Sequence, residues 1–315
     1  MKCRVILLSL CLAGALSMPA AALALTAAEA SNSAPIAENL TLTTYKNVAV
    51  NGQCAAVDPE GDLVTFQLME KPARGQVMLG EDGAFCYTPY ENKKGKDTFT
   101  YVAVDANGNV SDEATVKITI EKQTTKVSYS DMDGDSAHYA ALHLAERGVF
   151  TGTAIGGTYC FGPDEPVSRE EFLAMAMTAA GLDALDNVTV TGFCDDGDIS
   201  AWAKGYVSAG LMNGAVQGAS NEAGQAVFNA GHDITAAEAA VIIDRLLAMG
   251  DVATADTFSQ DLVPVWAYQA VVNMDAVSVV SMTGELNASL TRGEAAEMLS
   301  AMLDVLDSRN TGWFK

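Results

Sequence analysis

Three stretches of the same build determine how the C-terminal part of the chain folds: Ser168-Arg-Glu-Glu171, Thr235-Ala-Ala-Glu238 and Thr291-Arg-Gly-Glu294. Each has a hydroxyl residue, a glutamate three positions later and then an apolar-periodic run, at 172–180, 239–249 and 295–306. This is the capping box, in which the hydroxyl accepts a hydrogen bond from the amide three residues on and the glutamate reaches back to the cap. The sequence therefore predicts three helices that begin in the same way.

Two of the three capping boxes carry an arginine that helix formation does not explain. Arg169 and Arg292 lie in the first turn, where a cation opposes the helix dipole, while the second box has Ala236 at this position. A guanidinium beside the free amides of a helix start is a typical site for an anionic ligand. The alternative is an arginine that pairs with a neighbouring acid or faces solvent, and the sequence favours neither.

The same part of the chain is built from a repeated unit. Segments that begin at Tyr129, Phe193 and Phe258 recur at steps of 64 and 65 residues, and each is followed by a ring: Tyr139, Trp202 and Trp266. A fixed period indicates one supersecondary unit used several times. The helix that carries the ring is expected to end at a left-handed glycine, Gly148 in the first repeat and Gly210 in the second.

The N-terminal part shows the two-residue period of half-buried strands instead. The alternation is clearest at 64–68, 98–102 and 114–120, with turn signals at 58–62 and 107–109. Short strands at this spacing predict a β-sandwich.

The turns of this β domain are rich in oxygen ligands of the kind that calcium prefers: Asp58, Glu60, Asp62, Asp105, Asn107, Asn109 and Asp112. Asp and Asn are also common in tight turns, because they hydrogen-bond their own backbone. Turn formation is the favoured interpretation, and no other cofactor or metal is expected.

Composition and the N-terminus point to export. The 315 residues include 18 Lys plus Arg against 40 Asp plus Glu, a formal net charge of −22, which excludes sequence-independent binding to nucleic acid. Residues 1–24 have the basic start, the apolar core and the Ala-Leu-Ala end of a secretory signal peptide. No other stretch is apolar over the length of a membrane span, so no transmembrane segment is expected.

Cysteine usage agrees with an oxidising compartment. Loss of the signal would leave four cysteines, and the absence of any CxxC pair favours disulfides over a zinc site. Because each half of the chain holds two of them, we expect Cys54 to pair with Cys86, and Cys160 with Cys194.

Both halves resemble known families. Residues 34–121 are similar to bacterial cadherin-like or Ig-like modules, through DPEGD at 58–62, DGAFCYTP at 82–89 and DTFTYVAVDANGN at 97–109. The C-terminal half resembles S-layer homology (SLH) repeats, which combine an aromatic-x-Asp start, a glycine-bounded turn, a Phe-x-Pro element and a Thr-Arg-x-Glu helix. The first repeat matches nearly throughout, whereas the second has Ala236 for the arginine and the third Gln260 for the aspartate.

These resemblances imply a multidomain chain, in which an all-β Ig/cadherin-like sandwich is followed by a mainly α, pseudo-threefold SLH repeat domain. The expected boundaries are a signal peptide (1–24), a linker (25–33), the sandwich (34–121), a second linker (122–127), SLH repeats at 128–182, 190–249 and 255–307, and a tail (308–315).

The SLH family also implies grooves between repeats that bind cell-wall glycan, often a pyruvylated polymer. Carried onto this sequence, Arg169 and Arg292 become the anion contacts, and the other groove residues are Asp131, Asp195, Tyr139, Trp202, Trp266, Gly152 and Gly214. For the two tryptophans, packing in the core is the favoured alternative, since an amphipathic helix needs a large apolar residue there.

The expected function is that of a secreted, non-catalytic protein of the cell wall or S-layer, anchored by its repeats to a cell-wall polysaccharide. No nucleophile, P-loop or dinucleotide motif is present, so no enzyme activity is expected. The alternative is a surface adhesion or assembly module whose degenerate repeats bind other surface proteins, with calcium on the sandwich.

Overall fold

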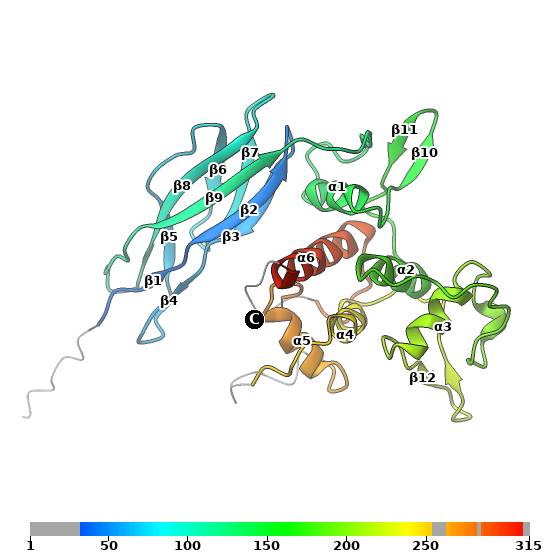
Figure 1. Ribbon diagram of the computed structural model, residues 1–315. Helices are drawn as coiled ribbons and strands as arrows, with labels where there is room; N and C mark the ends of the chain where they lie inside the picture. The colour runs from blue at the N-terminus through cyan, green and yellow to red at the C-terminus, as the bar shows by residue number, and fades with distance from the viewer. Residues whose placement is uncertain (1–31, 254–262, 282–284, 311–315) are drawn as a thin grey trace, which may run out of the picture.

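The computed structural model describes residues 32–253, 263–281 and 285–310, which form two domains (Figure 1). None of the helices within these ranges has the length and hydropathy of a membrane span. The predicted signal peptide, Phe258 and Gln260 lie outside the described residues.

The N-terminal domain has two facing sheets. One has the strand order β2-β9-β8-β5 and the other β3-β7-β6, with β1 and β4 as a separate pair. The strands are β1 (Ile36–Ala37), β2 (Leu40–Tyr45), β3 (Val50–Gln53), β4 (Ala56–Val57), β5 (Thr65–Leu68), β6 (Gly75–Leu79), β7 (Ala84–Pro89), β8 (Gly95–Val104) and β9 (Ala114–Glu121). The three predicted strands are thus confirmed as β5, β8 and β9, and alternate residues of β9 are buried in the core between the sheets.

Two acidic turns of this domain hydrogen-bond their own backbone. One carboxylate oxygen of Asp58 accepts from the amides two and four residues later, both at 3.0 Å. Asp105 does the same, at 2.8 Å for each amide. This supports the turn-forming interpretation. Within the described ranges, no group of three or more His, Cys, Asp or Glu side chains is arranged to hold a metal ion.

The C-terminal domain is mainly helical. Its helices are α1 (His138–Glu146), α2 (Arg169–Ala179), α3 (Lys204–Met212), α4 (Ala236–Leu247), α5 (Tyr268–Asp275) and α6 (Arg292–Asn310). Short hairpins, β10 (Thr153–Ile155) with β11 (Thr158–Cys160) and β12 (Ala219–Ser220) with β13 (Ala226–Val227), and a 3-10 turn, η1 (Asp196–Asp198), lie between them. The last helix, α6, contacts α1, α2 and α4, and it lies with α1 on the side of the helical domain that faces the sandwich (Figure 1).

The three capping boxes are confirmed at the starts of α2, α4 and α6. Ser168 and Thr235 each accept from the amide of the glutamate three residues on, and the glutamate side chain accepts from the cap in return. Thr291 makes the same pair of contacts at α6, at 3.3 Å and 2.8 Å.

The segments before these three helices also contact one another in a closed order. Isolated β-bridges join Ser168 to Asp233, Thr235 to Ser289, and Thr291 to Pro166. The start of each capping-box helix is therefore held against the segment that leads into another one, and side chains from different repeats meet there.

The first helix of each repeat begins after a buried alanine, at Ala137, Ala203 and Ala267. Trp202 and Trp266 directly precede this alanine, whereas Tyr139 follows it by two positions. The residue of the first repeat that corresponds to the tryptophans is therefore Ser136. The predicted equivalence of Tyr139 with the two tryptophans is wrong.

The predicted end of the second of these helices is also wrong. Gly148 follows α1 with a left-handed φ of 69°, as expected, but Gly210 lies inside α3. The left-handed residue after α3 is Gly214, with a φ of 77°. A side chain at Gly210 would place its Cβ 3.4 Å from Leu173, so this glycine permits close packing of α3 on α2 instead.

The predicted disulfides are not formed, because all four cysteines in the described part of the chain are free. Cys54 is 2% exposed in the sandwich core, whereas Cys86 points to the other face of the same sheet and cannot reach it. Cys160 and Cys194 belong to different repeats, and each thiol contacts a polar side chain of its own repeat.

Candidate ligand grooves

Two cavities of similar build lie between the repeats. Groove A has a volume of about 390 Å³, and its lining includes Arg169, Gly218, Phe228, Glu238, Arg245 and Trp266. Groove B has a volume of about 440 Å³, and its lining includes Phe150, Glu171, Thr178, Trp202, Tyr206 and Arg292. Each cavity thus combines an arginine from one capping box, the glutamate of another and a tryptophan from a third part of the domain.

Arg169 forms the cationic wall of groove A. Its side chain is 15% exposed, and its Nη1 lies 3.2 Å from Oε1 of Glu238. The guanidinium carbon lies 5.4 Å from the centre of the Phe228 ring, within cation–π range. Burial lowers the pKa of Arg169, Arg245 adds to this effect and Glu238 opposes it, but an arginine stays charged at neutral pH.

Arg292 has similar surroundings in groove B, but its acidic partner is not a capping-box glutamate. Its side chain is 19% exposed, and its Nη1 lies 2.6 Å from Oε2 of Glu165. The same nitrogen donates to the carbonyl oxygen of Phe161 at 2.7 Å, and the guanidinium carbon lies 5.7 Å from the centre of the Phe150 ring. Both alternatives that the sequence left open are therefore present together, because each arginine pairs with an acid and still lines a cavity.

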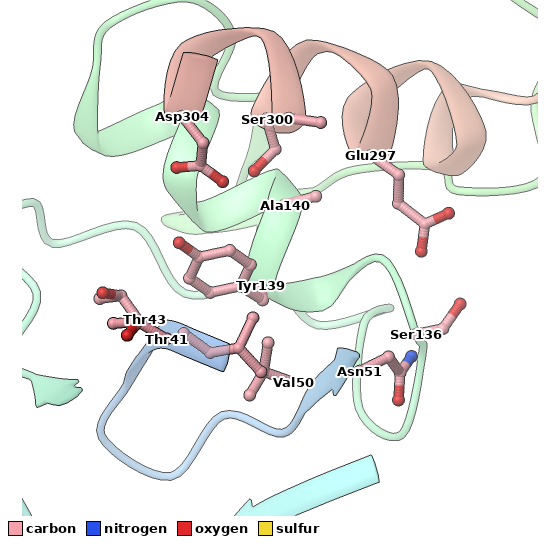
Figure 2. A pocket seen from close by; sticks show the side chains of 12 residues that line it. Thr41, Thr43, Val50, Asn51, Ser136, Tyr139, Ala140, Glu297, Ser300 and Asp304 are labelled. Carbon is pink, nitrogen blue, oxygen red and sulfur yellow. The ribbon is translucent and has the colours of Figure 1, made fainter. Parts of the chain in front are cut away.

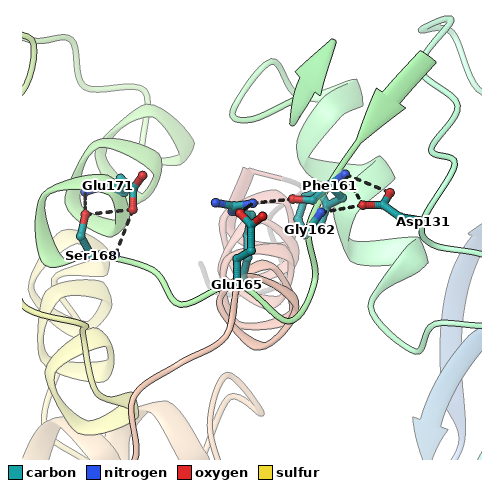
Figure 3. Close-up of polar contacts among 7 residues, drawn as sticks. Asp131, Phe161, Gly162, Glu165, Ser168 and Glu171 are labelled. Carbon is teal, nitrogen blue, oxygen red and sulfur yellow. Dashed lines mark hydrogen bonds and ion pairs between the residues drawn. The ribbon is translucent and has the colours of Figure 1, made fainter. Parts of the chain in front are cut away.

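The two aspartates predicted as groove residues hold loops in place. The carboxylate of Asp131 accepts from the amides of Phe161 and Gly162, at 2.8 to 3.0 Å (Figure 3). Partial burial alone would raise its pKa, but these amides outweigh that effect and hold the pKa below its usual range. Asp195 binds the amides of Phe228 and the next residue in the same way. The aspartates thus position the phenylalanines and the loops beside the arginines, and neither lines groove A or groove B.

The tryptophans lie where a ligand can reach them. Trp202 is 53% exposed and Trp266 is 63% exposed, and each lies in the turn before its helix rather than on the buried helix face. Core packing is therefore the wrong interpretation for both rings. Tyr139, in contrast, is half-buried and lines neither groove A nor groove B.

The glycines show one groove residue that the sequence reading missed. Gly152 has a φ of 71°, and a Cβ there would lie 2.4 Å from the carbonyl oxygen of Cys160. Its counterpart in the second repeat is Gly218, with a φ of 76°, which lines groove A. Gly214, the residue that was predicted, faces open space and lines neither groove. The sequence does contain a signal for Gly218: it follows Gly214 by four residues, as Gly152 follows Gly148 in the first repeat.

A third cavity, groove C, occupies the corresponding position on α6. It has a volume of about 780 Å³, and its lining includes Ala236, Glu294, Glu297 and Met298. On α6 the positions three, four and seven after the capping-box glutamate hold Glu297, Met298 and Ala301. The same positions on α2 and α4 line grooves B and A.

Groove C lacks both residue types that distinguish the other two. Ala236 stands where they have an arginine, and Ser136, which corresponds to the two tryptophans, does not line this cavity. What remains near α6 is acidic, because Glu294 and Glu297 both line the cavity.

Comparison with known families agrees with the two-domain arrangement. Residues 32–122 match the model of the bacterial cadherin-like domain, and residues 128–173 match that of the S-layer homology domain. The chain is therefore a multidomain protein with a β-rich cadherin-like domain followed by an SLH domain. SLH domains bind cell-wall polymers, which indicates association with the bacterial cell surface.

A curated relative matches part of the chain. It is an amylopullulanase from Thermoanaerobacterium thermosulfurigenes, 31% identical over 134 residues, which are 41% of this chain and 7% of the relative. The chain thus spans a small fraction of the length of that protein.

Solved structures overlap only locally with this one. The SrpA adhesin from Streptococcus sanguinis matches with a TM-score of 0.24 and 18% identity, over 32% of this chain and 62% of the adhesin. An endo-fucoidan hydrolase from glycoside hydrolase family 107 matches with a TM-score of 0.24 and 14% identity, over 31% of this chain and 15% of the hydrolase. Overlaps this small say nothing about function.

Proposed function

We propose that the protein is a secreted, non-catalytic component of the cell wall or S-layer that anchors itself to an anionic cell-wall glycan. In this proposal three SLH repeats form a pseudo-threefold domain, the second and third being divergent copies of the first. Grooves A and B hold the glycan, and the sandwich is displayed outward.

One observation carries the proposal. In a chain with a formal net charge of −22, the same trio of groups occurs twice at a cavity: a guanidinium at a helix start, a phenylalanine ring beneath it and an exposed indole. The guanidinium suits a carboxylate on a sugar, whereas the first amides of both helices already donate to protein oxygens. The indole offers an apolar face beside it.

The two grooves differ in charge, which predicts a difference in affinity. Groove A is lined by Arg169 and Arg245 against Glu238. Groove B is lined by Arg292 against Glu171, and Glu165 already pairs with this arginine. A polyanion should therefore bind more tightly in groove A.

The test is cosedimentation of the full chain with purified Gram-positive cell walls, before and after acid extraction of the secondary polymer. We expect binding to intact walls and loss of binding after extraction. The double variant Arg169→Ala/Arg292→Ala should bind at least about tenfold more weakly, because two charge-assisted contacts are lost.

The matched control is Arg74→Ala, which removes an arginine of the sandwich outside the grooves and should bind like the wild type. If the double variant is retained as well as this control, the repeats do not anchor through the grooves. That outcome would favour the other candidate, a surface adhesion or assembly module that binds proteins.

A further inference from the structure

Groove C is a poor site for the ligand of the other two grooves. Ala236 replaces the arginine, Ser136, which replaces the tryptophan, lines the adjoining cavity, and the two glutamates on α6 would repel a polyanion. One residue of the sandwich also lines this groove. Gln53, at the end of β3, lines groove C together with residues of α6.

The strands β2 and β3 face α1 and α6 across a further cavity, distinct from grooves A, B and C, of about 460 Å³ (Figure 2). Thr41, Thr43, Val50 and Asn51 line it from the sandwich, and Ser136, Tyr139, Glu297 and Asp304 line it from the helices. Because Glu297 lines both cavities, this one adjoins groove C.

Direct packing holds the two domains together beside this cavity. Tyr45 of β2 is 6% exposed, and its ring stacks on that of Tyr139, with the centroids 5.6 Å apart. Tyr45 and Val48 belong to the hydrophobic core of the helical domain, not to that of the sandwich. Tyr139 also contacts the ring of His143, whose Nδ1 lies 2.9 Å from the hydroxyl of Ser300 on α6.

The linker between the domains is held as well. The carboxylate of Glu146, at the end of α1, accepts from the amides and the hydroxyls of Thr124 and Thr125. Burial alone would raise the pKa of Glu146, but these hydrogen bonds lower it to about 2. A linker bonded in this way restricts how the sandwich moves relative to α1.

We infer that the chain's own cadherin-like domain docks with its β2–β3 edge against α1 and α6, beside groove C, which Gln53 of this edge lines. The groove that lacks the arginine and the tryptophan is thus the one that adjoins an intramolecular interface. The docking is inferred from the contacts of Tyr45 and Glu146 and does not depend on the proposed function. That two grooves remain for a ligand rests on the proposed function.

Small-angle X-ray scattering of the ligand-free full chain tests the docking. The wild type should scatter as a single compact arrangement of the two domains. Tyr45→Ala and Tyr139→Ala should each increase the maximum dimension, and the double variant should expand no further than either single variant, because both remove the same contact. Tyr45→Phe keeps the stacked ring and should scatter like the wild type.

Tyr90→Ala, which removes a half-exposed tyrosine elsewhere on the sandwich, is the matched control and should also leave the scattering unchanged. A wild type that scatters as two independently moving domains would overturn the inference without any variant. So would a folded Tyr45→Ala chain with unchanged dimensions.

The two proposals fail separately in these experiments. A chain whose domains dock but which does not bind walls would overturn the proposed function alone. A chain that binds walls while its domains move independently would overturn the docking alone.

Discussion

Arg245 on α4 and Thr178 on α2 occupy the same position in two grooves, seven residues after the glutamate of each capping box. The side chain of Arg245 is exposed and forms no ion pair with any residue that the structure describes. It also lies close enough to Arg169 to lower the pKa of that residue. A second cation is therefore available to a ligand in groove A and missing in groove B.

Replacing Arg245 by the threonine of groove B should weaken wall binding without unfolding the domain. We expect about a fivefold loss of affinity at low salt, corresponding to about 1 kcal/mol for one partly exposed ionic contact. The loss should shrink as salt is raised. The reciprocal change, Thr178→Arg, should strengthen binding, and cosedimentation of both variants over a salt series measures the difference. Equal binding of Arg245→Thr and wild type at low salt would exclude a role for Arg245.

Alanine should be much more harmful at Gly218 than at Gly214. Both residues are left-handed, which costs about 1 to 2 kcal/mol for an alanine. At Gly218 the new Cβ would also lie 2.4 Å from the Phe193 ring and 2.7 Å from a carbonyl oxygen, whereas at Gly214 it meets open space. Chemical denaturation should show a difference of at least about 1 kcal/mol between the variants, since overpacking adds to the backbone strain. Equal losses of stability would contradict the assignment of Gly218 as the counterpart of Gly152.

Asp131 should matter for stability because it satisfies two backbone amides. Asp131→Ala should lower the free energy of unfolding by about 1 to 2 kcal/mol, less than for a buried site because the side chain is exposed. Asp133→Ala removes an exposed acid from the same loop and is expected to have little effect. If wall binding were lost in Asp131→Ala while stability stayed the same, the aspartate would instead contact the ligand.

The interface beside groove C should make stability depend on pH. Burial raises the pKa of Asp304 to about 6, Asp307 adds to this effect and Arg147 opposes it. Because the folded pKa is raised, the contribution of this carboxyl is fully present near pH 4 and is lost as the pH rises through about 6. Asp304 is an exposed residue whose side chain lines the cavity between the domains, so solvent screening reduces the size of the effect.

Thermal unfolding at pH 5 and pH 7 measures this effect. The wild type should have a lower Tm at pH 7 than at pH 5 by an amount that Asp304→Asn reduces. An identical pH difference in the wild type and in this variant would show that the titrating group lies elsewhere.

The cysteines should behave as free thiols of very different reactivity. Cys194 is exposed and should be alkylated rapidly by iodoacetamide in the native protein. Cys54 is buried, and burial raises its pKa to about 12, so it should react only after unfolding. Mass spectrometry of alkylated peptides without reductant measures both. A labelling pattern that changes when reductant is added would mean that a disulfide does form.

Local chemistry made much of the fold predictable. The capping boxes at Ser168, Thr235 and Thr291 fix helix starts through contacts within four residues, so the sequence alone contains the needed information. The same holds for the two-residue alternation of β9. Both arginines of the grooves were found because a cation at a helix start is out of place.

The errors arose where the answer depends on distant residues. Aligning rings by type placed Tyr139 with the tryptophans, although its contact is with Tyr45 in the other domain. Trp202 and Trp266 were named as groove residues with core packing as the favoured alternative, because an apolar residue on an amphipathic helix is normally buried, yet here they line cavities that form between repeats. The Cys54–Cys86 pairing is wrong because the face on which a cysteine lies follows from strand register, and the Cys160–Cys194 pairing is wrong because each thiol contacts a side chain of its own repeat.

The hydrogen bonds between Glu146 and the linker have a mechanical consequence. A pulling force on the sandwich would not simply extend the linker, because Thr124 and Thr125 are hydrogen-bonded to Glu146 at the end of α1. The load would pass through α1 into α6, which contacts α2 and α4 as well. A force on the sandwich would therefore be distributed over the three helices that begin at capping boxes. Two of these helices, α2 and α6, carry the arginines of grooves A and B.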